Sequence, residues 1–184
     1  MKRLTDIVFA LLLLALIWPL LLVIALIVRT DSPGPFVYRQ IRVGLHGRSF
    51  GMFKFRSMVV NADRIGGYQT HQGDPRITRS GRWLRKTSLD ELPQLFNVLL
   101  GDMSFVGPRP DVPAQRELYS EQDWALRTSV RPGITGLAQA TLRSEARAAQ
   151  RLALDLEYVR RQSLWLDLKI LVMTVRQVLG KGSY

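Results

Sequence analysis

The sequence predicts a mixed α/β protein, mostly α-helical with one small β-hairpin. Two observations divide the chain: no charged residue lies between Asp6 and Arg29, and the composition changes sharply at the turn sequence SPGP, residues 32–35. After that turn come two short runs rich in aromatic and branched residues, and then runs with helical periodicity. We therefore expect an N-terminal hydrophobic membrane segment at residues 1–30 and one compact domain at residues 31–184.

The chain is strongly basic and contains no cysteine. Its net charge of +11 over 184 residues implies an anionic partner: nucleic acid, an anionic lipid surface or a phosphorylated substrate. The sequence carries no helix-turn-helix, zinc-finger or RNA-binding motif, so we expect no nucleic acid partner. The lack of cysteine excludes disulfides and thiolate metal sites and is typical of a reducing compartment.

The apolar run Ile7–Val28 has the length of a membrane segment. As a straight helix it would measure about 33 Å, which matches the hydrocarbon core of a bilayer. The apolar region of a cleaved signal peptide is shorter, and no small-residue cleavage site follows in VRTDSPGPF. We therefore expect a retained membrane segment.

Trp18-Pro19 lies in the middle of this run. A proline there removes the hydrogen bond to the carbonyl of Ala15 and kinks the helix. Basic residues flank the run on both sides, and positive charge favours the cytoplasmic face for each flank. A helix-break-helix that enters one leaflet and returns satisfies both flanks. An ordinary spanning helix with a tolerated proline fits the same features equally well.

The β-hairpin is predicted by FVYRQIRVG (residues 36–44) and RSFGMFKFRSM (residues 48–58), joined by the turn LHG. Alternation along the second strand places Lys54 and Arg56 on one face. Two like charges on one face normally indicate a solvated surface. They favour a binding role only where an anion lies nearby.

Arginine recurs at every third position in the next segment, at Arg76, Arg79, Arg82 and Arg85. In a helix these residues would form a basic stripe. Because Trp83 lies among them, the stripe suits a lipid headgroup surface, and a solvated surface helix is the alternative.

SLDELPQLFN, residues 88–97, places Asp90 and Glu91 at a helix start. The spacing of Ser88 and Glu91 is that of a capping box, and Pro93 makes Asp90 a rival N-cap. Because the first turn of a helix favours negative charge, we expect Asp90 to stay ionised, as a carboxylate nucleophile or metal ligand requires. The helix continues with one apolar face at residues 92, 95, 96 and 99 and ends at Gly101.

Arginines on rigid turns follow the acidic pair. In VGPRPD, residues 106–111, two prolines fix the backbone around Arg109, which suits bidentate contact with phosphate oxygens. The alternative is a structural ion pair with Asp102 or Asp111. VRPGITGLAQATLRSEAR adds Arg131 and Arg143 beside a glycine-rich turn. Carboxylates that can hold a divalent cation, together with such arginines, indicate phosphoryl chemistry.

Two helices are expected at the C-terminus, in SEARAAQRLALDLEYVRRQ and LWLDLKILVMTVRQVLG. The second has apolar residues at 164, 168, 171, 175 and 178, a stripe that packs on the core or rests on lipid. His46 and His71 are isolated, and we assign neither a ligand role.

Three segments resemble one family closely: KFRSM, DPRITRSGRWLRKTSLDELPQLFNVLLGDMSFVGPRP and RPGITGLAQ. They are similar to the bacterial sugar transferases, the monotopic polyprenyl-phosphate phosphoglycosyl transferases. The similarity extends from Phe36 to the last helix, and the membrane segment lies where the family has its own.

The resemblance implies a reaction. A phosphosugar moves from a nucleoside diphosphate sugar to polyprenyl phosphate, usually undecaprenyl phosphate, with release of nucleoside monophosphate, at the start of glycoconjugate synthesis. By position, Asp90 would be the nucleophile that forms a covalent phosphosugar intermediate, and Glu91 would assist. Both carboxylates would bind Mg²⁺. Phosphate contacts would come from Arg109 and, with weaker support, from Lys54, Arg85 and Arg143. Direct transfer in a ternary complex is the mechanistic alternative, and a basic membrane scaffold is the non-enzymatic one.

The resemblance also implies a place. It favours the re-entrant segment, with both ends and the catalytic domain on the cytoplasmic face of the bacterial inner membrane, and interfacial amphipathic helices. It leaves homodimer formation open. Two departures stand out: Trp18-Pro19 replaces the Ser-Pro frequent in relatives, and TLR at 141–143 stands where relatives tend to have Asn-Gly-Arg.

Overall fold

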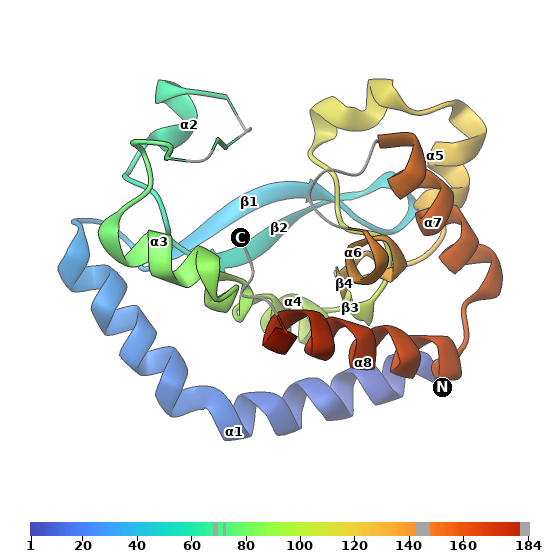
Figure 1. Ribbon diagram of the computed structural model, residues 1–184, viewed down its shortest axis with the longest axis horizontal. Helices are drawn as coiled ribbons and strands as arrows, with labels where there is room; N and C mark the ends of the chain where they lie inside the picture. Colours follow the sequence, from blue (N-terminus) through green and yellow to red (C-terminus); the bar gives the residue numbers. More distant parts are fainter. Residues whose placement is uncertain (68–69, 72, 143–147, 181–184) are drawn as a thin grey trace.

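The computed structural model describes the chain except residues 68–69, 72, 143–147 and 181–184 (Figure 1). It is a mixed α/β fold, mostly helical with a small β-hairpin, as predicted, and with a further short strand pair. In chain order the elements are α1 (Lys2–Asp31), β1 (Val37–Val43), η1 (Leu45–Gly47), β2 (Ser49–Phe55), α2 (Ala62–Ile65), α3 (Arg79–Lys86), η2 (Leu89–Glu91), α4 (Gln94–Leu100), β3 (Ser104–Val106), η3 (Pro113–Leu118), α5 (Glu121–Arg127), β4 (Gly133–Thr135), α6 (Leu137–Thr141), α7 (Ala148–Arg161) and α8 (Leu164–Gly180).

The predicted hairpin is confirmed. Strands β1 and β2 pair in antiparallel register from Val37 opposite Phe55 to Val43 opposite Ser49, and η1 closes the turn. Residues directly opposite one another share a face of the hairpin, so Lys54 lies on the same face as Tyr38, Gln40 and Arg42. Arg56 falls just after β2. It is buried and donates to the carbonyls of Pro33 and Ser32, so it secures the end of α1 rather than a binding face.

A second strand pair, β3 with β4, was not predicted. The two short strands run parallel, with Ser104 opposite Gly133 and Val106 opposite Thr135. Their backbones approach so closely that a Cβ at Gly133 would lie 2.1 Å from the Gly107 nitrogen. The glycine-rich turn of RPGITG is therefore explained by packing between backbones.

Helix α1 is a single helix with Pro19 inside it, and it bends near its middle (Figure 1). The predicted break is thus a bend in a continuous helix, not an interruption. By length and composition α1 can cross a membrane. Its large apolar side chains are mostly exposed, among them Leu16, Trp18 and Leu26, which is compatible with membrane association.

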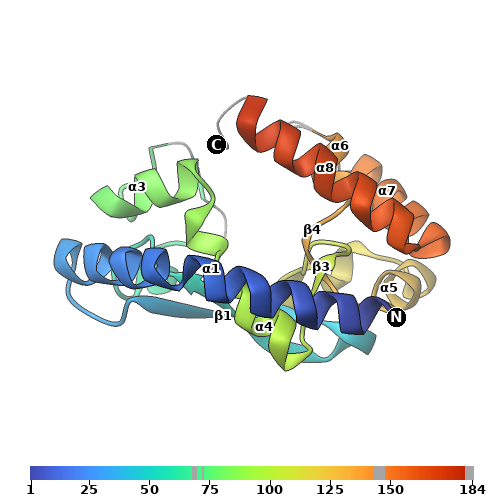
Figure 2. The ribbon, with the colours of Figure 1, turned by 90° about the horizontal axis from the view of Figure 1, so that it is seen from below.

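Both ends of α1 are bound to the rest of the chain. At the N-terminal end, Lys2 Nζ lies 2.5 Å from Asp167 Oδ2 on α8, and Arg3 donates to the carbonyls of Val98 and Leu99 on α4. At the other end, Asp31 accepts from the backbone N–H and hydroxyl of Ser80 on α3. Figure 2, seen from below, shows α1 crossing the molecule between α3 and α4, both of which it contacts.

Among the described residues the hydrophobic core forms three clusters, two of which include α1 residues. The first is centred on Ala10, Met52, Val98 and Met103, the second on Ile24, Val28, Phe55 and Leu84, and the third on Val106, Tyr158 and Ile170. Helix α8 contributes Ile170 to the core. Of its predicted apolar stripe, Leu164, Leu168 and Val175 are exposed, and Val178 lies outside the side chains that the structure describes.

Two further helix predictions need correction. The basic stripe is shorter than expected, because Arg76 precedes α3 and binds Asp74 and the carbonyls of residues 62 and 66. In α4, Leu95 is buried as predicted, but Phe96 is exposed and Val98 takes its place in the core. Gly101 ends α4 as predicted, with φ 95 and hydrogen bonds to the carbonyls of Asn97 and Val98.

Candidate active site

Asp90 and Glu91 lie in the 3₁₀ turn η2, between α3 and α4. Ser88, just before it, has a left-handed backbone with φ 56, a conformation that costs free energy for a residue other than glycine. Its N–H donates to the carbonyl of Arg85, so it cannot bind the Glu91 side chain. The predicted capping box is therefore wrong. The turn frees the Glu91 carboxylate to face the hairpin.

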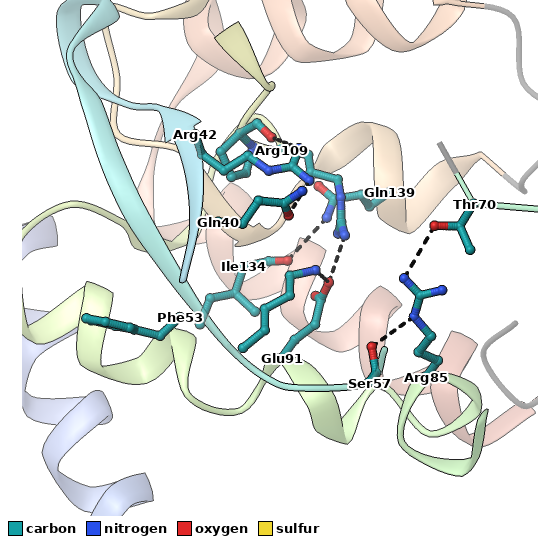
Figure 3. Close-up of polar contacts among 12 residues, drawn as sticks. Gln40, Arg42, Phe53, Ser57, Thr70, Arg85, Glu91, Arg109, Ile134 and Gln139 are labelled. Carbon is teal, nitrogen blue, oxygen red and sulfur yellow. Dashed lines mark hydrogen bonds and ion pairs between the residues drawn. The ribbon is translucent and has the colours of Figure 1, made fainter. Parts of the chain in front are cut away.

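Glu91 is the point where three segments meet. Its Oε1 accepts from Lys54 Nζ on β2 at 2.7 Å and from Arg109 of the Pro-Arg-Pro loop, also at 2.7 Å (Figure 3). The side chains of Lys54 and Glu91 are largely buried, whereas that of Arg109 is 49% exposed. The structure thus brings Lys54 and Arg109 to the acidic pair, and Arg109 keeps an open side toward solvent. The alternative partners of Arg109, Asp102 and Asp111, do not bind its side chain.

The two neighbouring carboxyl groups differ in their electrostatic surroundings. Asp90 is 6% exposed, and burial raises its pKa. The positive charge of Lys54 opposes this upward shift but only partly offsets it. Burial acts on Glu91 too, but the charges of Arg109 and Lys54 outweigh it and hold the pKa of Glu91 well below its usual range. We expected the start of a helix to favour the ionised form of Asp90, but the residue lies in a 3₁₀ turn, where burial shifts its pKa upward.

Arg85 and Arg143 have different outcomes. Arg85 on α3 donates to Ser57 Oγ at 3.2 Å and to Thr70 Oγ1 at 3.5 Å (Figure 3). Its positive charge opposes the upward shift of the Asp90 pKa. It therefore belongs to the same electrostatic group. Arg143 lies outside the described residues. Arg131 donates to the carbonyl of Gly101 and takes no part in the site.

Three polar residues beside Arg109 were missed: Gln40, Arg42 and Gln139 (Figure 3). Arg42 donates to Gln40 Oε1 at 2.8 Å and to the carbonyl of Pro110 at 2.9 Å. Within the described part of the chain, Arg42 Nε and Gln139 Oε1 are buried without a hydrogen-bond partner. Strand alternation could have identified Gln40 and Arg42, because both lie on the Lys54 face of the hairpin.

The chain matches known proteins along its whole length. The family model described as Bacterial sugar transferase matches residues 1–181. The UDP-glucose:undecaprenyl-phosphate glucose-1-phosphate transferase of Klebsiella pneumoniae is 48% identical over 100% of this chain and 41% of its own length.

Two other relatives widen the comparison. The UDP-N-acetylgalactosamine-undecaprenyl-phosphate N-acetylgalactosaminephosphotransferase of Aeromonas hydrophila is 41% identical over 99% of this chain and 44% of its own length. The exopolysaccharide production protein PSS of Rhizobium leguminosarum bv. phaseoli is 44% identical over 100% of this chain and 97% of its own length. This chain thus spans under half of the first two relatives and nearly all of the third. It belongs to the bacterial sugar transferase family.

Proposed function

We propose that the chain transfers a phosphosugar from a nucleoside diphosphate sugar to undecaprenyl phosphate, with UDP-glucose as the first donor to test. The observation that carries the proposal is the buried Asp90 beside Glu91, onto which Lys54 and Arg109 converge, in a chain of this family. Two relatives are named as undecaprenyl-phosphate sugar phosphotransferases, one for UDP-glucose and one for UDP-N-acetylgalactosamine.

Asp90 acts as the nucleophile in the proposed reaction. A carboxylate oxygen of Asp90 attacks the phosphorus that bears the sugar, and the bond from that phosphorus to the nucleoside monophosphate oxygen breaks. An oxygen of undecaprenyl phosphate then attacks the same phosphorus, and the aspartyl bond breaks to restore the carboxylate. In the alternative, direct transfer between the substrates, Asp90 would serve only as a metal ligand or base.

The cations around the acidic pair support this chemistry. An anionic nucleophile that approaches a diphosphate is repelled, and phosphoryl transfer depends mainly on charge neutralisation and positioning. Arg109 uses one side to bind Glu91 and leaves half of its side chain exposed for phosphate oxygens. Lys54 and Arg85 add positive charge next to Asp90.

The residues present also fit Mg²⁺. This ion is commonly held by one or two carboxylates and completed by substrate phosphates and water. Among the described residues no cluster of three or more potential metal ligands occurs, which agrees with a site completed by substrate. Asp90 and Glu91 would hold the ion, which would supply further neutralisation of phosphate charge.

Membrane attachment follows from α1 and α8. Both ends of α1 contact the same domain, which supports a re-entrant segment and a monotopic protein. The basic residues that flank the apolar run on both sides support the cytoplasmic face. The exposed Leu164, Trp165 and Leu168 of α8 would rest on lipid.

The test uses the full chain in detergent or nanodiscs with Mg²⁺, undecaprenyl phosphate and UDP-glucose or UDP-N-acetylgalactosamine. We expect nucleoside monophosphate release with at least one donor, and its loss in Asp90→Asn. If neither donor yields nucleoside monophosphate, the proposal is contradicted. Mass spectrometry of intact protein with donor alone separates the mechanisms, because only the covalent route leaves a phosphosugar adduct.

A further inference from the structure

The Pro-Arg-Pro loop is held in place through its carbonyl groups. Pro108 and Pro110 have no N–H to donate, so neighbouring elements can fix this backbone chiefly by donating to it. Four consecutive carbonyls accept hydrogen bonds from four donors: Pro108 O from Gly133 N at 3.0 Å, Arg109 O from Arg127 at 2.7 Å, Pro110 O from Arg42 at 2.9 Å, and Asp111 O from Val43 N at 2.9 Å.

The carbonyl of Arg109 is the one that matters for the site. Pro110 restricts the ψ of Arg109 to the extended range, and a hydrogen bond to the Arg109 carbonyl narrows that range further. The direction of the Arg109 carbonyl sets this ψ, and with it the course of the chain where the side chain leaves. The donor to that carbonyl therefore helps to set the direction in which the Arg109 side chain leaves the backbone, toward Glu91.

That donor, Arg127, is a buried residue at the end of α5. Its guanidinium binds the Arg109 carbonyl, the carboxylate of Asp111 and, at 3.0 Å, the carboxylate of Asp155 on α7. The ring of Tyr119 lies 5.4 Å away. Because the side chain is only 7% exposed and each of its three nitrogens donates to a protein acceptor, we do not expect it to bind substrate.

We propose that Arg127 is a positioning residue for Arg109. Its planar, forked guanidinium joins the loop at two residues, Arg109 and Asp111, to α7, so that Arg109 is presented to Glu91 and to a phosphate in one fixed orientation. The inference rests on the proposed function in so far as Arg109 contacts a phosphate. A lysine would keep the charge, but its single nitrogen cannot reproduce the fork.

A double-mutant cycle tests this. We measure kcat/KM for UDP-glucose, with Mg²⁺ and undecaprenyl phosphate, in wild type, Arg127→Lys, Arg109→Ala and the double variant. If Arg127 acts through Arg109, Arg127→Lys lowers kcat/KM by at least about tenfold alone and by less than about twofold in the Arg109→Ala background. An equal loss in both backgrounds, or no loss in either, would overturn the proposal.

Arg56→Lys is the matched control. Arg56 is also a buried arginine that donates to backbone carbonyls, but it binds the end of α1. Any effect of Arg56→Lys should be the same with and without Arg109, since it acts through stability alone. Coupling of Arg56 to Arg109 as large as that of Arg127 would overturn a specific role for Arg127.

Hydrogen–deuterium exchange provides a readout that does not need turnover. Arg127→Lys should speed exchange in peptides that cover residues 103–112 while the hairpin keeps wild-type protection. The proposal would be overturned if exchange became faster throughout the domain, or if it did not become faster in residues 103–112. If wild type releases no nucleoside monophosphate, the proposed function fails while the exchange result still decides the role of Arg127.

Discussion

Asp90 and Glu91 are adjacent in one 3₁₀ turn, yet the fold shifts the pKa values of their carboxyl groups in opposite directions. Burial raises the pKa of Asp90, whereas Arg109 and Lys54 hold the pKa of Glu91 low despite its burial. Neighbouring carboxyl groups with separated pKa values are typical of sites in which each has its own role. Glu91 pairs with Lys54 and Arg109, whereas the pKa of Asp90 is shifted toward neutral pH.

Replacing Lys54 by methionine should move the acid limb of the pH profile. In the proposed mechanism the carboxylate form of Asp90 is the active one, so kcat/KM should fall as pH drops through its pKa. Lys54 lowers this pKa, so Lys54→Met raises it and shifts the acid limb to higher pH. The measurement is kcat/KM against pH in wild type and variant. Arg39→Met, on the opposite face of the same hairpin, is the control and should leave the limb in place.

Glu91→Gln should shift the same limb the other way. The negative charge of Glu91 raises the pKa of Asp90, so its removal lowers that pKa and moves the acid limb to lower pH. The rate at the optimum should also fall by roughly 100-fold, because Lys54 and Arg109 lose the anion that orients them. A Glu91→Gln limb that moved upward with that of Lys54→Met would contradict this electrostatic assignment.

Asp155→Asn should remove a pH dependence of stability. Burial raises the pKa of Asp155 from 3.8 to about 6, although Arg127 opposes this. The unfolded chain loses the proton first, so stability falls as pH rises through the interval from 3.8 to about 6 and is level above it. Across that interval wild type should lose up to about 3 kcal/mol relative to the asparagine variant. Thermal unfolding of both proteins at a series of pH values measures this difference. If the stabilities of the two proteins changed in parallel with pH, the prediction would be contradicted.

Gly81→Ala should destabilise the contact between α3 and the segment after β2. A Cβ at Gly81 would lie 2.0 Å from the carbonyl oxygen of Ser57, so backbone must move. Helix propensity alone would make alanine the more stable residue by about 1 kcal/mol, so the sign of the effect is decisive. We expect a loss of about 1–3 kcal/mol in thermal unfolding. Gly67→Ala, where nothing lies within 4 Å, is the control and should be nearly neutral.

Sequence reasoning reached those features that depend on short-range pattern. Alternation and a three-residue turn identify the hairpin, and the uncharged run identifies α1. The parallel pair of β3 and β4 could not be predicted, because each strand has three residues and its pairing depends on glycine contacts between distant segments.

The site residues that lie in short sequence motifs could be predicted. The properties that depend on tertiary packing could not. Lys54 and Arg109 were selected from their motifs and lie against Glu91. The position of Asp90 was identified, but the direction of its pKa was not, since burial is a property of the fold. Arg127 carries no local signal at all, because its three acceptors belong to the Pro-Arg-Pro loop and α7.

The last prediction concerns the side of the membrane on which α1 ends. Both ends contact the same domain, so a spanning orientation would break either the Arg3 contacts with α4 or the Asp31 contact with α3. Because the chain has no cysteine, Leu4→Cys and Thr30→Cys give single labelling sites near the two ends.

In a re-entrant arrangement a membrane-impermeant maleimide labels neither cysteine in intact spheroplasts and both in inverted vesicles. Labelling of one cysteine from the outside would show a spanning helix instead. In the proposed re-entrant arrangement the bend at Pro19 returns the chain to its own side, and Pro19→Ala provides an N–H that can donate to the carbonyl of Ala15. We expect Pro19→Ala, combined with Leu4→Cys, to make that cysteine partly accessible from the outside, because a straighter helix of about 45 Å favours crossing the bilayer. Leu16→Ala, an exposed change close to the bend, is the matched control and should leave the labelling pattern unchanged.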